Sequence, residues 1–516
     1  MNLSKSQSAV IRAKKTAKIY LEGVAGTGKT TAAVGKLATW LETGTPAHHI
    51  LILLPQITLA TPYRESLRSA DRPEGTDATI ATFGSLTQTL IALFWMLIAE
   101  KAGFANPQKP PTFLSLETSQ YFMGRLLDPI IERDGLFDTV KQPRNRLYSQ
   151  ILDNLNKSAL VDFPHTQIAN RLSMAWDGND NDPQLRVYAD VQVCANAFRA
   201  YCYQENLLDF SLQVELLIQH LLPLPEVKNY LAKQFRYIIA DNCEENSLAA
   251  HRLLKVLVDG AKGAVLIADL LGGYRSFLGA DVSLLHYARE LCDAHHTFTE
   301  LFTSTPAIHQ FASELVTTLG TPDIIPPPSA NLSDGNIINS FRYYPQLTDA
   351  VADEVNRLVG EGVPPHEIAI LSPFLTDTLR FSLMSRLEGM SIPVRSHRPS
   401  RPLSEEPPAL ALLHLACLAH PQWGIHPARQ DLITAFKTAL GMDLVRAQLL
   451  VSRLVTWKGL RPILKSFMEL PPNQQTRITF GYGAKYESLR TWLDLASSSP
   501  EQPLDHFWRR LFGEVL

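Results

Sequence analysis

A glycine-rich segment near the start of the chain has the residue types and spacing of a phosphate-binding loop. The pattern G-x-x-x-x-G-K-[ST] is met by eight consecutive residues, Gly23, Val24, Ala25, Gly26, Thr27, Gly28, Lys29 and Thr30. The glycines let the backbone curl so that its N–H groups point at phosphate oxygens, and the helix that follows adds the positive end of its dipole. We expect Lys29 to reach the β- and γ-phosphates and the Thr30 hydroxyl to bind Mg²⁺. The segment, extended to Thr31, therefore predicts a site for ATP with Mg²⁺; the alternative is a glycine-rich turn without a ligand.

The residues around this loop alternate between strand-like and helix-like patterns. Strands are expected at residues 17–21, 49–54, 77–82, 237–240 and 264–268, and helices at residues 4–14 and 30–41. Such alternation predicts an α/β domain with a parallel sheet and helices on both faces. From residue 86 to residue 203 the pattern is helical and is broken by a polar loop at residues 177–183. The sheet domain is therefore expected to contain a large helical insertion.

A second α/β pattern follows a proline-rich break at residues 325–328. It consists of strands at residues 337–341 and 367–371 and helices at residues 346–359 and 376–388, and the tail from about Pro407 onward is mainly helical. The longest apolar run, residues 89–99, is too short to cross a bilayer, so a buried helix is expected there rather than a membrane span. His295 and His296 have no partner ligands nearby in the sequence and are expected in a loop rather than in a metal site.

The overall composition describes a folding, core-forming chain. Of its 516 residues, 45% are hydrophobic and 19% are charged, which is a globular rather than a disordered mixture. The five cysteines show no C-x-x-C pair, so we expect reduced core thiols in a cytoplasmic protein. The net charge of −3 provides no global basic field. Any nucleic-acid site must therefore be local.

Further segments stand in a fixed order along the chain, at residues 3–7 (LSKSQ), 82–86 (TFGSL), 208–210 (LDF), 237–241 (YIIAD), 267–280 and 298–308 (FTELFTSTPAI). In this order they resemble the motifs of superfamily 1 DNA helicases of the UvrD/Rep type, and the resemblance covers nearly the whole chain. It implies a RecA-like P-loop NTPase that steps 3′ to 5′ on single-stranded DNA and acts in DNA repair or recombination. One segment, residues 50–67 (ILILLPQITLATPYRESL), is more similar to the P-x-Q-x-T motif of AddB-like recombination nucleases.

The resemblance assigns further residues to the nucleotide site. Gln7 is expected to read the adenine edge, because its amide offers one donor and one acceptor. Phe302 is expected to stack on adenine, and Asp241 to hold Mg²⁺ together with Thr30. The family places a catalytic glutamate directly after the metal-binding aspartate, whereas this chain has Asn242.

Other departures from the family pattern weaken the prediction of hydrolysis. An amide such as that of Asn242 cannot take a proton from water, and loss of a general base costs about 10²–10⁴-fold in rate. The nearest replacements are Glu244 and Glu245. Three further positions have lost their expected side chain: Gly272 replaces a glutamine that senses the γ-phosphate, and Leu278 and Thr303 replace arginines. We expect ATP binding to persist and hydrolysis to be impaired.

The same resemblance suggests where single-stranded DNA would bind. Phe277 stands at the position of a base-stacking aromatic residue, and Phe83 belongs to a DNA-facing segment in which Gly84 replaces a histidine. Arg64 and Arg275 are the nearby basic residues that suit phosphates. The alternative for Phe83 and Phe277 is an ordinary position in the hydrophobic core.

The resemblance also divides the chain. It implies a RecA-like ATP-binding domain at residues 1–95 and 206–328, a helical insertion at 96–205, the first half of a second RecA-like domain at 329–405 and a helical subdomain at 406–516. The sequence ends before the family's last two motifs, so a protein partner is expected to complete the second domain. The alternatives are a non-catalytic ATP-binding or structural subunit of an AddB-like recombination complex, an incomplete reading frame, and a metabolic P-loop kinase.

Overall fold

The computed structural model describes residues 3–69, 77–178, 182–269, 271–318, 341–396, 406–498 and 504–515. The chain divides into two compact units, and each is described by itself. The first contains Met1–Thr303 and Arg401–Leu516, and the second contains Ser304–Ser400.

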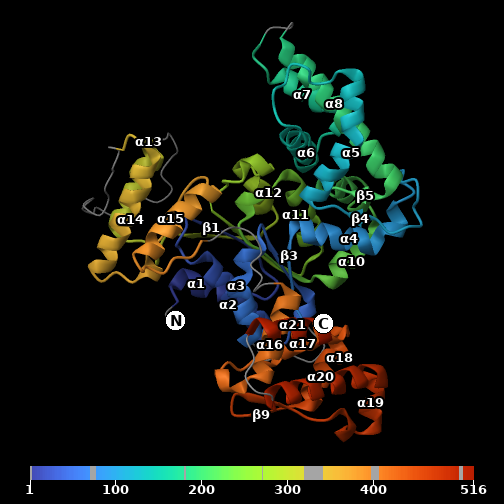
Figure 1. The fold of residues 1–516 in the computed structure, drawn as a ribbon, viewed down its shortest axis with the longest axis vertical. Helices are drawn as coiled ribbons and strands as arrows, with labels where there is room; N and C mark the ends of the chain where they lie inside the picture. The colour runs from blue at the N-terminus through green and yellow to red at the C-terminus, as the bar shows by residue number, and fades with distance from the viewer. Residues whose placement is uncertain are drawn as a thin grey trace. The chain divides into compact units, whose positions relative to one another are not determined.

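A six-stranded parallel sheet carries the N-terminal part of the first unit (Figure 1). The strand order is β3-β2-β6-β7-β1-β8, so β7 lies between β1 and β6. The strands are β1 (Lys18–Gly23), β2 (Ile50–Leu54), β3 (Thr79–Thr82), β6 (Tyr237–Ala240), β7 (Gly263–Ala268) and β8 (Ala294–Phe298). Because the strands are parallel, the residues that follow their carboxyl ends meet at one edge of the sheet.

The expected α/β fold with a parallel sheet is confirmed, and one local expectation is wrong. His295 and His296 lie in β8, which pairs with β1, and not in a loop. This strand forms one edge of the sheet, and its side chains alternate between partly buried and exposed before the buried Phe298. An edge strand needs no continuous apolar run, so its sequence did not have the pattern of the buried strands.

Helices cover both faces of the sheet. On one face lie α1 (Lys5–Arg12), α2 (Lys29–Glu42) and α3 (Thr61–Ser69), and on the other lie α4 (Phe83–Ile98), α9 (Phe210–Leu216), α10 (Pro225–Gln234), α11 (Leu248–Gly260) and α12 (Leu285–Glu290). Successive residues of β2 alternate between the two cores: Ile50 and Ile52 pack with α1–α3, whereas Leu51 and Leu53 pack on the opposite face. Burial on both faces explains why the central strands are continuously apolar. All five cysteines are buried and unpaired.

The helical insertion expected between the two halves of the sheet is present. It contains the helices α5 (Leu116–Asp134), α6 (Arg144–Leu160), α7 (Ile168–Met174) and α8 (Pro183–Glu205), and the short parallel pair of β4 (Thr112–Phe113) and β5 (Leu207–Leu208). In Figure 1 these helices extend away from the sheet. Their apolar side chains, such as Met123 and Phe198, belong to the same core cluster as one face of the sheet. The insertion therefore shares its hydrophobic core with the sheet domain.

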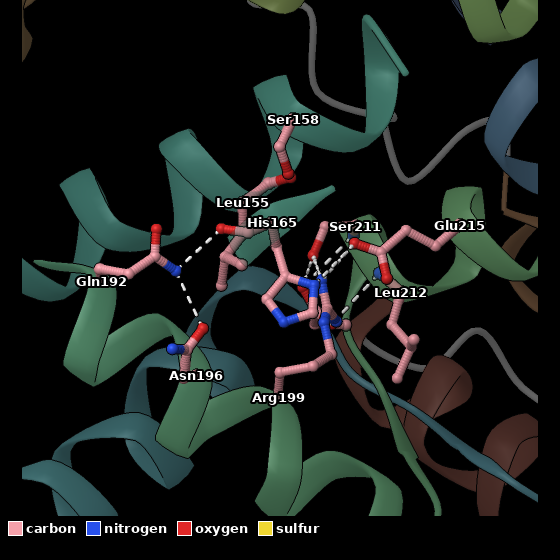
Figure 2. A network of polar contacts seen from close by, with 10 residues as sticks. Leu155, Ser158, His165, Gln192, Asn196, Arg199, Ser211, Leu212 and Glu215 are labelled. Carbon is pink, nitrogen blue, oxygen red and sulfur yellow. Dashed lines mark hydrogen bonds and ion pairs between the residues drawn. The ribbon is translucent and has the colours of Figure 1, made fainter. Parts of the chain in front are cut away.

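A buried ionic network joins the end of the insertion to the sheet domain (Figure 2). Arg199 on α8 is 2% exposed, and its guanidinium lies 2.8 Å from a carboxylate oxygen of Asp209 and 3.1 Å from one of Glu215. Asp209 also caps α9, because its side chain accepts hydrogen bonds from the backbone N–H groups of Ser211 and Leu212. The Leu208-Asp209-Phe210 segment is thus the anchored point at which the chain leaves the insertion.

The apolar run at residues 89–99 lies in α4, which is buried on one side only. Leu90, Ile91 and Trp95 face the core, whereas Leu93 and Met96 are 54% and 61% exposed. None of the helices in the described ranges is long and apolar enough to cross a membrane.

The second unit contains α13 (Pro306–Thr318), α14 (Tyr344–Gly360) and α15 (Asp377–Gly389), so the two helices expected near residues 346–359 and 376–388 are confirmed. A small cluster of Ala352, Val355, Leu387 and Ile392 packs α14 against the end of α15. The strand expected at residues 367–371 is wrong, because a 3-10 turn at Pro365–Glu367 is followed by residues without regular structure. No strand among the described residues of this unit is available to pair with it. Residues 337–340 of the other expected strand, and the break at 325–328, lie outside the described residues.

The C-terminal tail is mainly helical, as expected. It has its own hydrophobic core, formed by α16 (Pro407–Ala419), α17 (Arg429–Leu440), α18 (Leu444–Leu454), α19 (Pro472–Ile478), α20 (Phe480–Ser498) and α21 (Leu504–Val515). The tail also contains an antiparallel hairpin that the sequence patterns did not predict, formed by β9 (Val455–Lys458) and β10 (Arg461–Leu464).

Candidate nucleotide-binding site

The glycine-rich segment forms the turn between β1 and α2. Gly26 and Gly28 have φ values of +83° and +74°, in the left-handed region that favours glycine, and Gly28 is the N-cap of α2. A Cβ atom on Gly26 would lie 2.3 Å from Thr303 Oγ1, and one on Gly28 would lie 2.2 Å from Gln7 Nε2. Glycine is therefore required at both positions by the backbone conformation and by the close approach of neighbouring side chains.

Hydrogen bonds within the turn hold its shape. The buried Thr27 donates its hydroxyl to Val24 O at 2.8 Å, and Lys29 Nζ donates to Gly23 O at 2.6 Å and Val24 O at 2.8 Å. Ala25 at the tip of the turn is exposed, and Thr31 lies in the first turn of α2. The ammonium group of Lys29 is thus held beside the turn, at the N-terminal end of α2, where the helix dipole also favours an anion.

Asp241 follows β6 and meets the first turn of α2. Its Oδ2 accepts hydrogen bonds from Thr30 Oγ1 at 2.9 Å and from the Tyr63 hydroxyl at 2.7 Å, and its Oδ1 accepts one from Asn242 N at 2.9 Å. Burial raises the pKa of Asp241, and the hydrogen bonds from Tyr63 and Thr30 oppose this shift. A hydroxyl and a carboxylate this close together form a pair of oxygen ligands of the kind that Mg²⁺ takes.

Tyr63 was not identified from the sequence. It lies on α3 and is fully buried, and its hydroxyl donates to the carboxylate expected to hold the metal ion. A single tyrosine on a helix is in most cases a core residue, and only the tertiary contact reveals its second role. It belongs to the segment at residues 50–67, which is more similar to the AddB-like motif than to the UvrD/Rep pattern.

A second acidic residue approaches the loop from the neighbouring strand. Asp269 follows β7, and its Oδ2 lies 3.6 Å from Lys29 Nζ. Since β7 lies between β1 and β6, Asp241 and Asp269 come from adjacent strand ends. The sequence placed Asp269 within a family segment but assigned it no role, because only the strand order brings it to the lysine.

Asn242, in place of the catalytic glutamate, adopts a left-handed backbone with φ of +57°. Asparagine tolerates this conformation better than most residues with a side chain. Its Nδ2 donates to Glu244 Oε1 at 3.1 Å, so the amide points at a carboxylate of its own loop.

The two glutamates that follow are both engaged in hydrogen bonds to the segment after β7. Glu244 is 2% exposed and its Oε2 accepts from Asp269 N at 3.0 Å, while burial raises the pKa of its carboxyl. Glu245 accepts from Tyr274 N at 3.2 Å and Arg275 N at 3.1 Å. Both side chains therefore hold the backbone of this segment in place.

Gly272, which replaces the expected glutamine, lies directly against Glu244. A Cβ atom at this position would lie 2.7 Å from Glu244 Cγ and 3.0 Å from its Oε1. The space that a side chain at position 272 would need is therefore occupied by Glu244, which gives a physical reason for the glycine.

Gln7 and Phe302 both lie beside the turn, although they come from opposite ends of the sheet domain sequence. Gln7 is 4% exposed and caps α1 together with Ser4, and its Nε2 donates to Gly28 O at 3.3 Å. Phe302 N donates to Gly26 O at 2.9 Å, and its ring edge would lie 3.4 Å from a Cβ atom on Gly28. The Phe302 side chain is 52% exposed. The structure thus brings both residues expected at the adenine to the phosphate-binding turn.

The residues expected to contact DNA have different environments. Phe277, in a 3-10 turn at Ser276–Leu278, is 73% exposed, and Tyr274 nearby is 80% exposed. Phe83 begins α4 and packs, partly buried, against the hydrophobic core. Arg64 is partly buried on α3, and Arg275 Nη1 donates to Pro55 O at 3.1 Å. The exposed position of Phe277 suits a stacking role. Phe83 instead packs against the hydrophobic core, which was the alternative to a DNA contact.

The comparisons with known proteins agree with this arrangement. The family model described as UvrD/REP helicase N-terminal domain matches residues 3–292, which is more than half of the chain and includes the glycine-rich turn, Asp241 and Asp269. A search of curated proteins found no match. The matched range begins before Gln7 and ends just before β8, so it spans the helices and strands that position every residue of the site except Phe302. From this match, and from the sheet order and loop geometry that accompany it, the chain belongs to the UvrD/REP helicase family.

Proposed function

We propose that this protein binds ATP with Mg²⁺ and single-stranded DNA in DNA repair or recombination, with the architecture of a 3′-to-5′ motor but slow hydrolysis. The observation that carries the proposal is the meeting of three groups at one turn. The Lys29 ammonium lies beside the glycine-rich loop, and the Thr30 hydroxyl lies 2.9 Å from the Asp241 carboxylate.

The residues present fit a nucleoside triphosphate with its metal ion. Left-handed glycines at Gly26 and Gly28 free the loop to present backbone N–H groups, and Lys29 supplies a positive charge at the same place. Thr30 and Asp241 would hold Mg²⁺, while Gln7 and Phe302 flank the loop where a base would lie. When bound, ATP supplies a phosphoanhydride bond whose cleavage can drive movement along DNA.

Slow hydrolysis is supported by the groups around the site. Asn242 cannot act as a general base, and the carboxylates of Glu244 and Glu245 already accept backbone hydrogen bonds from the segment after β7. Thr303 and Leu278 stand where the family has arginines, and arginine fingers contribute about 10³–10⁵-fold in rate. The chain's own residues thus bind and orient the phosphates but provide little to stabilise charge that develops on them.

A DNA contact is supported by the exposed aromatic side chains after β7. Phe277 stands at the stacking position of the family motif, and Tyr274 lies three residues before it with its ring in solvent. Stacking of a base on an aromatic side chain contributes about 1–3 kcal/mol. The backbone N–H of Tyr274 donates a hydrogen bond to Glu245 Oε1, and the loop that contains Glu245 begins at Asp241. A short hydrogen-bonded path therefore links the nucleotide site to the proposed DNA contact.

The test is ATP affinity and turnover of the full chain, measured with and without single-stranded DNA. Lys29→Ala is expected to abolish measurable ATP binding, and the unaltered chain is expected to turn over well below about 1 per second, at the low end of ordinary enzymes. A turnover of several per second that Lys29→Ala abolishes would contradict slow hydrolysis. ATP affinity that does not depend on Lys29 would contradict the nucleotide site itself, and would favour a structural subunit of a recombination complex.

A further inference from the structure

The hairpin of β9 and β10 in the C-terminal tail has one partly buried face and one exposed face. Antiparallel pairing places Lys458 opposite Arg461 and Trp457 opposite Pro462, and the turn consists of Gly459 and Leu460. Gly459 has a φ of +64°, as two-residue hairpin turns require. Since side chains alternate along a strand, these two opposed pairs lie on opposite faces of the hairpin.

Packing distinguishes the two faces. Val455 and Pro462 are buried on the inner face, and Val455 belongs to the hydrophobic core of the tail. Trp457, on the same face near the turn, is 37% exposed. Lys458 and Arg461 are exposed on the outer face, next to the exposed pair of Thr456 and Ile463. The core therefore holds the hairpin from one side, and the other side presents two cations to solvent.

Charge around the hairpin is strongly one-sided. Residues 444–468 contain basic side chains and no aspartate or glutamate, although acidic residues outnumber basic ones in the whole chain by 51 to 48. The basic residues in this segment are Arg446, Arg453, Lys458, Arg461 and Lys465. Arg446 pairs with Asp443, whereas within the described part of the chain no acidic side chain forms an ion pair with the other four.

Two like charges directly opposite each other destabilise a hairpin. Lys458 and Arg461 therefore repel each other, and a bound anion would relieve this repulsion. Directly opposed residues have Cβ atoms about 4.5–5.5 Å apart. Phosphates recur every ~3.4 Å of axial rise along a DNA strand, so two such cations can reach neighbouring phosphates. The basic side chains of residues 444–468 extend beyond this pair, which suits an extended polyanion better than a compact anion.

We propose that the outer face of this hairpin is a binding site for the phosphate backbone of nucleic acid, with Lys458 and Arg461 as the contacting residues. The choice of nucleic acid over other polyanions rests on the proposed DNA-binding function of this helicase-family chain. The site is separate in sequence from the aromatic residues after β7 and contributes through charge rather than through stacking. It adds affinity without reading sequence, as phosphate contacts do.

The experiment measures how the affinity of the full chain for labelled single-stranded and duplex DNA depends on salt. Neutralising both cations with Lys458→Gln and Arg461→Gln should reduce the slope of log K against log salt by about 1.4 for a single strand, or about 1.8 for a duplex. Between about 50 and 200 mM salt, the variant should therefore lose about 7-fold less affinity than the unaltered chain on a single strand. Both residues are exposed, so the variant should fold normally, and relief of the repulsion between them should leave its unfolding temperature no lower than that of the unaltered chain.

The matched control is Lys228→Gln with Lys233→Gln on α10, two exposed lysines whose loss changes the net charge equally. This control should retain the original slope. An unchanged slope in the hairpin variant, or an equal decrease in both double variants, would overturn the hairpin site while leaving the DNA-binding proposal intact. Absence of DNA binding by the unaltered chain would overturn both, and hairpin-dependent binding of polyglutamate but not of DNA would assign the surface to an acidic protein.

Discussion

Gly28 is the N-cap of α2, and the chain passes from the phosphate-binding turn into the helix at this residue. Its φ of +74° opposes any side chain, and a Cβ atom there would lie only 2.2 Å from Gln7 Nε2. We expect Gly28→Ala to cost about 1–2 kcal/mol of stability, from left-handed strain. It should also weaken ATP binding by at least about tenfold, because the displaced N-cap no longer aims its N–H groups at phosphate. Urea denaturation and nucleotide titration measure the two effects separately.

Gly44 supplies the control for this substitution. Its φ of +78° is nearly the same, but a Cβ atom there would have no neighbour within 4 Å. Gly44→Ala should show a similar loss of stability, again about 1–2 kcal/mol, with unchanged ATP affinity. Equal losses of ATP affinity in the two variants would mean that general destabilisation, and not the geometry of the loop, weakens binding.

Among the elements, the junction of α8 and α9 depends on one buried cation. Figure 2 shows the Arg199 guanidinium among Ser211, Glu215 and the neighbouring helix, and Asp209 completes its pairing. We expect Arg199→Met to destabilise the chain by about 3–5 kcal/mol, because it leaves two carboxylates near the core without their partner. The change in the urea midpoint for unfolding, with the slope held constant, measures this effect.

An exposed arginine of the same insertion tests whether burial is the cause. Arg133 pairs with its neighbour Asp134 on the surface of α5, with 72% of its side chain exposed. Arg133→Met should leave the unfolding midpoint almost unchanged, since solvent screens surface pairs. If both variants unfold at the original midpoint, the buried network does not hold the insertion to the sheet domain.

For the molecule as a whole, stability in acid should depend on histidines whose pKa is lowered by burial, which in the described ranges are His48, His220, His251 and His414. His251 on α11 is 3% exposed, and neither of its ring nitrogens has a hydrogen-bond partner in the described part of the chain. Burial is the main reason that the pKa of His251 is lowered to about 4, and the nearby charge of His286 lowers it further. The unfolded chain, with an ordinary histidine pKa of about 6.5, therefore binds more protons than the folded chain between these two values.

Stability should consequently rise with pH across this window and be lost as the pH falls below about 6.5. The loss should approach about 3 kcal/mol near pH 4. Replacing His251 with phenylalanine should make the pH dependence of the unfolding free energy less steep across the same window, while the other three histidines keep their share of it. His366→Gln, at an exposed position in the second unit, is the control and should retain the original dependence. Parallel curves for the His251 variant and the unaltered chain would show that protonation of this residue is not coupled to unfolding.

Much of the fold followed from local patterns. The strands β2, β6 and β7 are buried on both faces, so their sequences are continuously apolar, and the helices of the sheet domain repeat with helical spacing. The phosphate-binding turn was equally predictable, because its glycines and lysine are consecutive in the chain. The strand β8, the hairpin of β9 and β10 and the irregular segment after Glu367 were not predicted. Their form depends on whether a partner strand is available, which no local pattern records.

By itself the sequence determined the position of the phosphate-binding turn, the apolar strands around it and the family to which they belong, since each is encoded by residues close together in the chain. Only the tertiary structure decided which distant side chains meet there. It placed Tyr63 on the Asp241 carboxylate and Asp269 beside Lys29. The physical reason is the strand order, because the strand that ends at Asp269 lies between the strand of the lysine loop and the strand of Asp241.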